Sequence, residues 1–252
     1  TLDTRKAKQP CRRHERFYSR AIADSHIGRY QVAASSENGV VIDPPTKLEE
    51  YKAVTWASQV KTIKITKDVP HLNSNLGLVD GHLSVSEFKF TPAELFGAMA
   101  QCSHLHTFDP WGASVEWTMA QVLVQHHVDD TTSEFETLKS VNNLKDFIKG
   151  GLAGAIAAGM AYLTMIKNGY HWHAHFEKVA FDNPKVKKRP DFVFLGGHLN
   201  VALVESKGSA TGSLSSLDKR TEEGYVNQVE PHLGFMPMGL LLTGGGFCIG
   251  TL

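Results

Sequence analysis

The stretch RPDFVFLGGHLNVALVESKG, residues 189–208, constrains the fold of this chain more than any other part of the sequence. Two apolar runs, each long enough for one strand, flank a Gly-Gly pair, which is typical of a turn between antiparallel strands. Because residues i and i+2 of a strand face the same side, Glu205 and Lys207 are expected to point together. A hairpin through the glycines brings Asp191 beside them. Two carboxylates and one ammonium group are therefore predicted to meet at one edge of a sheet.

The segments around this hairpin extend the pattern into a domain. A long apolar helix is expected over residues 142–167, where Asn-Gly ends it, and the alternating YHWHAHFEKVAF after it predicts a strand. The hairpin follows, then a helix over about 217–230 and two closing strands, GLLLT and FCIGTL. The order helix, three strands, helix, strand predicts an α/β or α+β fold, in which helices flank a mixed β-sheet.

The first half of the chain carries weaker patterns. Residues 1–50 are polar and irregular, and a change of composition near 130–140 indicates a boundary. We therefore expect an N-terminal helical and mixed region of unknown role, residues 1–140, and a second domain, residues 141–252. Thr91 and Glu94 have the spacing of a capping box, which predicts a helix start. The expected elements are strands in 51–66 and 81–90 and helices over about 91–104 and 113–128.

Composition excludes some classes of protein. The formal net charge is zero, so the chain does not bind nucleic acid through its overall charge. The three cysteines are far apart and form no CxxC pair, which is typical of a reducing compartment, and we expect a cytoplasmic location. The basic N-terminal residues are not followed by an apolar run, so no signal peptide is expected.

The apolar stretch GLAGAIAAGMAYLTMI is too short for a bilayer span, which needs ~20 residues. Gly151, Ala155 and Gly159 repeat at a spacing that lets a helix approach another element closely. We expect this helix to be buried against the sheet through its Gly and Ala positions, with no membrane as a partner.

The residue types at the hairpin indicate metal chemistry. Buried charges are expensive unless they pair with each other or hold a metal. The carboxylates of Asp191 and Glu205, together with water, would suit a hard divalent ion such as Mg²⁺ or Mn²⁺. Lys207 can then orient or deprotonate an attacking water, or offset negative charge in a transition state.

The residues Pro190-Asp191, thirteen intervening residues and then Glu205-Ser206-Lys207 resemble the PD-(D/E)XK, or restriction-endonuclease-like, nuclease superfamily. The core of that superfamily has the same order of elements, and the resemblance covers about residues 142–252. It implies that Asp191 and Glu205 are metal ligands, that the Ser206 carbonyl adds a third ligand, and that Lys207 is the catalytic lysine. The implied function is a divalent-metal-dependent endonuclease that hydrolyses phosphodiester bonds, in DNA in preference to RNA.

Basic residues near the motif are expected to contact phosphates by charge rather than to recognise base sequence. Gln228, on the helix after the motif, is a candidate contact for substrate or water. The sequence leaves the formation of a homodimer open. The expected basic contacts are Lys185, Lys187, Lys188, Arg189, Lys219 and Arg220.

Three alternatives stay open. The chain could be a catalytically inactive nucleic-acid-binding or assembly module of the same fold, since residues 152–156 lack the acidic residue that many superfamily members carry on the first core helix. The hairpin charges could also form a plain ion-pair cluster. A zinc hydrolase could use His171, His173 and His175, although their alternation with aromatic residues favours a strand with an aromatic core face and a polar histidine face.

Overall fold

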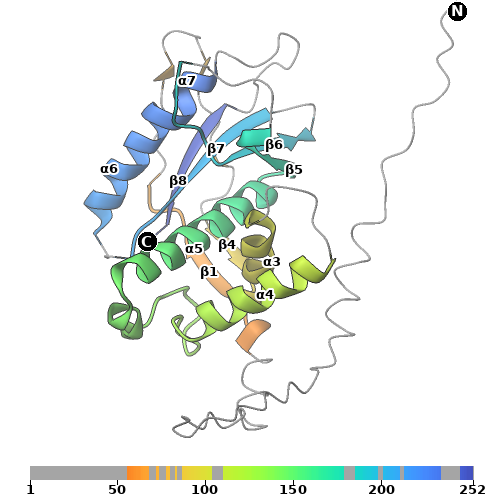
Figure 1. The fold of residues 1–252 in the computed structure, drawn as a ribbon, viewed down its shortest axis with the longest axis vertical. Helices are drawn as coiled ribbons and strands as arrows, with labels where there is room; N and C mark the ends of the chain where they lie inside the picture. Colours follow the sequence, from red (N-terminus) through yellow and green to blue (C-terminus); the bar gives the residue numbers. More distant parts are fainter. Residues whose placement is uncertain are drawn as a thin grey trace, which may run out of the picture. The chain divides into compact units, whose positions relative to one another are not determined.

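The computed structural model describes residues 56–67, 72–73, 78–79, 83, 87–103, 110–178, 185–197, 201–210, 213–233 and 245–251. Residues from Pro45 onward group into one compact unit. Its described part is a mixed α+β fold in which helices flank a mixed sheet, as predicted (Figure 1). The predicted strand GLLLT and residues 1–50 lie outside the described residues.

The main sheet has four strands in the order β5-β6-β7-β8. The first three strands pair in antiparallel fashion, and β8 lies parallel to β7. The predicted order of helix, three strands, helix and strand is confirmed along the chain. The strands are β5 (Tyr170–His175), β6 (Phe192–Gly196), β7 (Val201–Gly208) and β8 (Gly246–Thr251).

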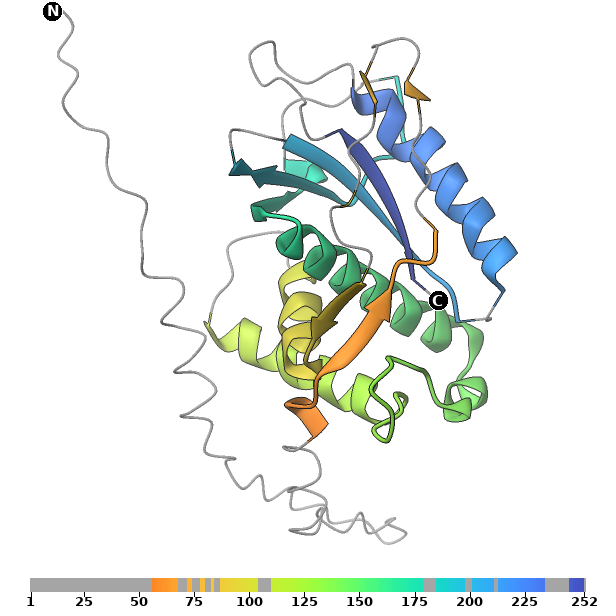
Figure 2. The same cartoon turned by 180° about the vertical axis from the view of Figure 1, so that it is seen from behind.

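Helices cover both faces of this sheet (Figures 1 and 2). Helix α5 (Asp146–Lys167) packs on the face that carries Phe192, Phe194 and Val204. The opposite face carries Val193 and Leu203. It is covered by α6 (Leu214–Gly224), the π-helical turn η4 (Tyr225–Val229) and α7 (Glu230–Leu233). Burial on both faces explains why β6 and β7 are continuous apolar runs rather than alternating ones.

A second apolar core joins α5 to the first half of the chain. Helix α3 packs on α5 and α4, and the shared cluster includes Phe90, Phe96, Val124 and Ile156. Thr91 and Glu94 form the predicted capping box, with Glu94 N donating to Thr91 Oγ1 at 3.2 Å and Thr91 N to Glu94 Oε2 at 2.6 Å. The elements of this part are β1 (Lys61–Lys64), β2 (Leu72–Asn73), β3 (Leu78–Val79), β4 (Glu87–Phe90), α3 (Pro92–Cys102) and α4 (Pro110–Gln125).

The glycines of α5 do not face the sheet, so that part of the prediction is wrong. A Cβ on Gly159 would lie 2.8 Å from Met99 Cγ, which places this glycine against α3, while Gly151 has open space around it. The sheet side of α5 is formed by Ala161 and Met165. By length and composition α5 is the one helix among the described residues that could span a membrane. In the fold it lies between α3 and the sheet.

Gly208 ends β7 where this strand passes closest to α5. A Cβ here would contact the carbonyl oxygen of Ala153 and lie 2.5 Å from its carbonyl carbon, and backbone atoms cannot rotate away. We expect Gly208→Ala to lower the free energy of unfolding by about 2–3 kcal/mol, as overpacking does. Denaturant unfolding measures this. Gly154→Ala is the matched control, because its position is open and a helical alanine should stabilise by ~0.5–1 kcal/mol. Equal effects of the two substitutions would contradict the close approach of β7 to α5.

Candidate active site

The hairpin of β6 and β7 brings the predicted site residues to neighbouring positions. The ladder ends at the pair of Phe192 of β6 with Val204 of β7, and continuing its register by one residue puts Asp191 beside Glu205. Lys207 follows two residues later on the same face of β7, near the end of the strand. The sequence therefore predicted correctly which strand segments lie beside one another.

Glu205 and Lys207 form an ion pair, in which Lys207 Nζ donates to Glu205 Oε1. The Glu205 side chain is only 2% exposed and that of Lys207 is 25% exposed. Gly224 of α6 makes room for the pair, because a Cβ there would lie 2.8 Å from Lys207 Cε and 2.9 Å from Cys248 Sγ. The pair is thus enclosed between the sheet and the end of α6.

Gln228 ties this ion pair to the segment that precedes β6. Lys207 Nζ donates to Gln228 Oε1 at 2.9 Å, and Gln228 Nε2 donates to the Arg189 carbonyl, also at 2.9 Å. Gln228 lies in the π-helical turn η4, and such turns occur frequently at functional sites. The sequence proposed Gln228 as a substrate or water contact, whereas here it contacts Lys207.

Asp191 is held by Ser206. Asp191 Oδ2 accepts hydrogen bonds from Ser206 N at 2.9 Å and from Ser206 Oγ at 2.6 Å. Ser206 therefore joins the site through its amide and its hydroxyl, and the carbonyl ligation that the family resemblance implies stays a prediction.

The pKa of Glu205 is unusually high for a glutamate. Burial, and secondly the charge of Asp191, raise the pKa of Glu205 to about 7, although Lys207 and Gln228 act in the opposite direction. Its Oε2 atom is buried and has no hydrogen-bond partner among the described residues. Buried polar atoms without a partner are uncommon and call for an explanation. A cation ligand would satisfy this oxygen.

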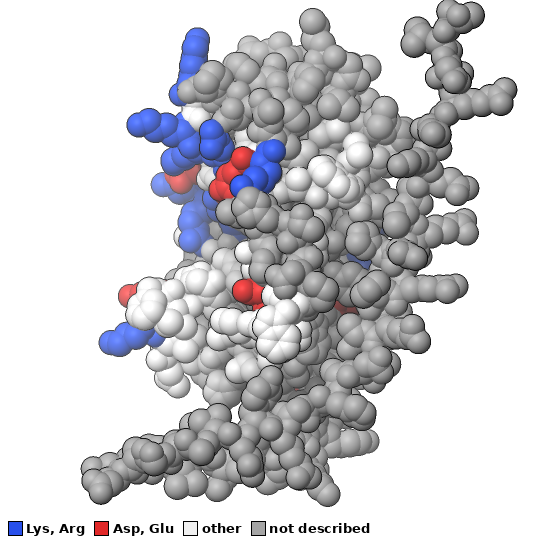
Figure 3. All heavy atoms as spheres, turned by 45° about the vertical axis from the view of Figure 1, so that its right-hand side comes forward, with Lys and Arg blue, Asp and Glu red and all other residues white. Residues whose placement is uncertain are grey.

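The basic residues proposed as phosphate contacts fall into two groups. The exposed loop of residues 185–189 leads into Asp191, and its backbone is anchored where Gln228 binds Arg189 and His232 Nε2 lies 3.0 Å from the Lys188 carbonyl. On α6, Arg220 Nη2 donates to the Gly208 carbonyl at 2.5 Å. Lys219 Nζ lies 3.9 Å from Glu223 Oε1. Figure 3 shows Lys and Arg side chains gathered on one part of the surface, with a few acidic side chains among them.

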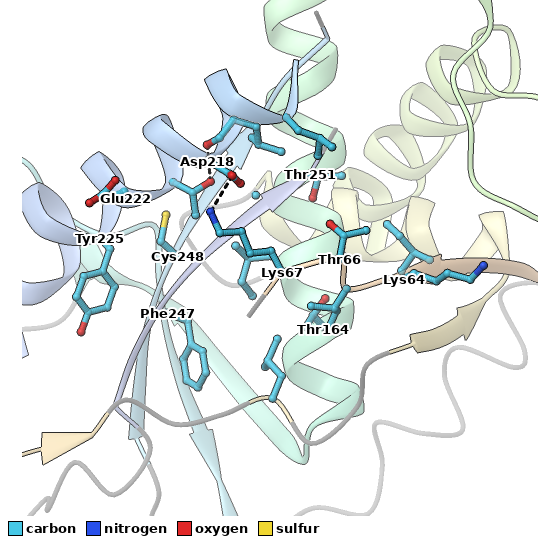
Figure 4. Close-up of a pocket in the computed structure, with 18 of the residues that line it drawn as sticks. Lys64, Thr66, Lys67, Thr164, Asp218, Glu222, Tyr225, Phe247, Cys248 and Thr251 are labelled. Atoms are coloured by element: carbon cyan, nitrogen blue, oxygen red, sulfur yellow. Dashed lines mark hydrogen bonds and ion pairs between the residues drawn. The ribbon is translucent and has the colours of Figure 1, made fainter. Parts of the chain in front are cut away.

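A pocket lies beside the candidate site rather than at it. It has a volume of about 530 Å³ and opens between β8, α6 and the segment after β1 (Figure 4). The Lys67–Asp218 ion pair, at 2.8 Å, crosses it, and Cys248 lies on its wall. Thr221 Oγ1 donates to a helix carbonyl, so this hydroxyl already has a partner. The Lys67–Asp218 ion pair and the Thr221 hydroxyl are already engaged with partners, so they do not indicate a catalytic role for this pocket. Glu205 and Lys207 do not line it.

The histidine strand differs from the sequence prediction. Trp172 is 53% exposed, whereas His173 is half-buried, with its ring centroid 4.8 Å from that of Tyr162 on α5. Burial lowers the pKa of His173 to about 4, and the neighbouring His175 adds to this shift. The expected aromatic core face and polar histidine face are therefore wrong at these positions. A register irregularity between Tyr170 and Trp172 interrupts the alternation, and α5 covers the face that carries His173.

Sequence reasoning missed Gly224 and Cys248, which both pack against the ion pair. Burial, with further contributions from Glu205 and Asp191, raises the pKa of Cys248 to about 12. Its thiol is therefore neutral near pH 7 and unsuited to act as a nucleophile. An isolated glycine within a helical pattern can mark a close approach, and this was the one available indication for Gly224.

No protein-family model, curated protein or solved structure matches this chain. Within the described part of the chain, no group of three or more His, Cys, Asp or Glu side chains is arranged to hold a metal ion. Any metal at the candidate site would therefore take two carboxylates, and its other ligands would be backbone oxygens, water or substrate.

Proposed function

We propose that this chain is a divalent-metal-dependent nuclease that hydrolyses phosphodiester bonds, in DNA in preference to RNA. The observation that carries the proposal is the combination of Asp191 next in register to Glu205, the contact of Lys207 with Glu205, and the buried Glu205 Oε2 without a partner. A purely structural ion pair has no need of the second carboxylate. It also gives no reason to leave a buried carboxylate oxygen unsatisfied.

The fold supports the same proposal. The element order α5, β5, β6, β7, α6, β8 and the single parallel pairing of β7 with β8 are those expected of a restriction-endonuclease-like core. In such a core the motif carboxylates stand at the second and third strands; here Asp191 immediately precedes β6 and Glu205 lies on β7. We therefore assign the finer fold class as part of this proposal.

The residues present fit a hard divalent cation. The unsatisfied Oε2 of Glu205 is a hard oxygen donor, and Asp191 supplies a second carboxylate. Mg²⁺ usually keeps several waters and binds through one or two carboxylates together with substrate phosphate, so two acidic ligands are sufficient. We assign Asp191, Glu205 and the Ser206 carbonyl as ligands for Mg²⁺ or Mn²⁺. When bound, the ion would polarise the phosphate and lower the pKa of a coordinated water.

The protein residues around the site have distinct roles in this proposal. Ser206 fixes the Asp191 carboxylate through two hydrogen bonds. Glu205 must be ionised to bind a cation, which favours activity above its pKa of about 7. Lys207 holds a positive charge beside Glu205, where it can orient water or offset the charge that develops on the phosphate. Gln228 fixes the Lys207 ammonium group by accepting its hydrogen bond.

The basic loop before β6 gives substrate a place to bind. The loop of residues 185–189 holds four exposed Lys and Arg side chains and leads directly into Asp191. In the proposed complex these side chains contact phosphates, which positions the backbone of the substrate without selecting a base sequence. Lys219 and Arg220 on α6 would extend this surface beyond the end of β7.

Asp191→Ala tests the proposal directly. We expect the wild-type chain to nick supercoiled plasmid DNA with Mg²⁺ or Mn²⁺ and to lose this activity in EDTA. Asp191→Ala removes a ligand, so Mn²⁺ affinity measured by calorimetry should fall at least about 10-fold and nicking should disappear. Asp146→Ala, an exposed acid in the first turn of α5, is the matched control and should leave both measurements unchanged. Wild-type protein that neither binds Mn²⁺ nor nicks DNA would overturn the proposal.

A second candidate function is nucleic-acid binding without cleavage. The observation that favours it is the small number of acidic groups at the site, since the described residues hold no cluster of three or more metal-ligating side chains. The same experiment separates the two functions. Salt-sensitive DNA binding with no cleavage in either metal would support the binding module.

A further inference from the structure

Helix α4 exposes a continuous apolar stripe. The side chains of Trp111, Val115, Met119 and Val122 are 73%, 42%, 54% and 64% exposed, and Leu123 at the margin of the stripe is 37% exposed. Their spacing of i, i+4, i+8 and i+11 places them on one side of the helix. Five large apolar side chains in one row are far more than the isolated exposed residues of an ordinary surface.

The opposite side of α4 already has its packing partners. Ala120 and Val124 are buried in the core that α4 shares with α3 and α5, and Trp117 meets Phe96 with ring centroids 5.4 Å apart. The stripe is therefore not needed to hold α4 in place. An amphipathic helix with a satisfied inner face and a second apolar face points to a partner outside the compact unit.

We infer that the stripe is the contact between two copies of this chain, which pack α4 against α4 in antiparallel fashion about a two-fold axis. In that arrangement Trp111 of one copy packs against Val122 and Leu123 of the other, and Val115 packs against Met119. The largest side chain thus meets smaller ones at both ends of the interface. A two-fold contact uses the same patch twice, as most soluble homodimers do. The inference does not rest on the proposed nuclease function.

The charge and area of the stripe favour a second copy over other occupants. Glu116 is the only charged residue of α4, and the stripe itself is uncharged, so two copies can meet through apolar side chains alone. The first twenty residues of the chain carry seven Lys and Arg, and a segment of that kind does not match an uncharged apolar stripe. The five side chains expose roughly 500 Å², so a symmetric pair would bury about 1,000 Å², the lower limit for a specific interface.

Sedimentation velocity of the full chain tests the inference. The wild type should form a concentration-dependent dimer, and Val122→Asp should weaken the dimer at least about 100-fold, because an unpaired charge would be buried against Trp111 of the other copy. Val60→Asp is the matched control, since Val60 is 55% exposed and lies outside α4. It should dimerise like the wild type.

Circular dichroism verifies that the variants fold, and Met119→Glu replaces Val122→Asp if the latter does not. A wild-type chain that stays monomeric over the whole concentration range would overturn the inference, whatever else covers the stripe. A dimer that persists in the folded α4 variants would overturn it equally, because the contact would then lie elsewhere. Loss of the dimer in Val60→Asp as well would also count against α4.

Discussion

Lys207→Ala is expected to lower the rate of metal-dependent cleavage by about 10³-fold, a typical loss when one group that stabilises transition-state charge is removed. The loss should appear in turnover at saturating Mg²⁺, while DNA affinity stays within about threefold of the wild type. Lys207 sits near the end of β7 with a quarter of its side chain exposed, so water can enter the space that truncation leaves. Single-turnover cleavage together with a DNA-binding titration separates the two effects.

Two further variants make this experiment decisive. Lys207→Met keeps most of the aliphatic stem and removes only the charge, so it should be as inactive as Lys207→Ala. Lys139→Ala, an exposed lysine in the turn η1 (Lys139–Asn143), should cleave at the wild-type rate. Cleavage by Lys207→Met at the wild-type rate would show that the ammonium group is a structural ion-pair partner and not part of the chemistry.

The elements of the main sheet could be predicted because their determinants are local. A Gly-Gly pair between two apolar runs specifies a hairpin, and the ladder then places Asp191 opposite Glu205 without further information. The capping box at Thr91 fixes a helix start in the same way. The grouping of the site residues followed from these local rules, which is why it agrees with the structure at Glu205 and Lys207.

The faces of β5 could not be assigned from the sequence, because aromatic and histidine side chains alternate along it and either set can face the core. Alternation places the two sets on opposite faces of the strand, but the helix that packs on the sheet decides which face is buried. Here α5 covers the side of His173, while Trp172 on the opposite side is half exposed. A period-two pattern therefore indicated that β5 is a strand, but not which of its faces is buried.

Long-range contacts account for the other differences. Lys61 is fully buried, and its Nζ donates to the carbonyls of Asp129, at 2.7 Å, and Thr132. Burial lowers the pKa of Lys61, while the charges of Asp129 and Asp130 oppose the shift. Its partners lie about seventy residues away, so no local pattern around Lys61 shows that a lysine is buried there. The contact of Gln228 with Lys207 likewise cannot be seen in the local sequence, because it depends on a π-helical turn that has no sequence signature of its own.

Glu205→Gln is expected to abolish cleavage and yet to stabilise the metal-free fold above neutral pH. The pKa of Glu205 is about 7 in the folded chain against 4.5 for an ordinary glutamate, so the folded chain binds more protons than the unfolded chain between these values. The corresponding stability is fully present below pH 4.5 and is lost as the pH rises through 7. At pH 8 the buried carboxylate thus costs up to about 3 kcal/mol, which the neutral amide avoids.

Denaturant unfolding in EDTA, at pH values from 5 to 8, measures this effect. The free energy of unfolding of Glu205→Gln should exceed that of the wild type by about 1–3 kcal/mol at pH 8, and the difference should fall below about 1 kcal/mol at pH 5. Glu223→Gln, an exposed glutamate paired with Lys219, should change stability by less than about 0.5 kcal/mol at every pH. A structural ion pair predicts the opposite sign, because removing one partner of a buried pair destabilises by about 3–5 kcal/mol. If Glu205→Gln is less stable than the wild type at pH 8, Glu205 serves the fold. If the variant is more stable than the wild type but inactive, the carboxylate lowers stability and is required for function.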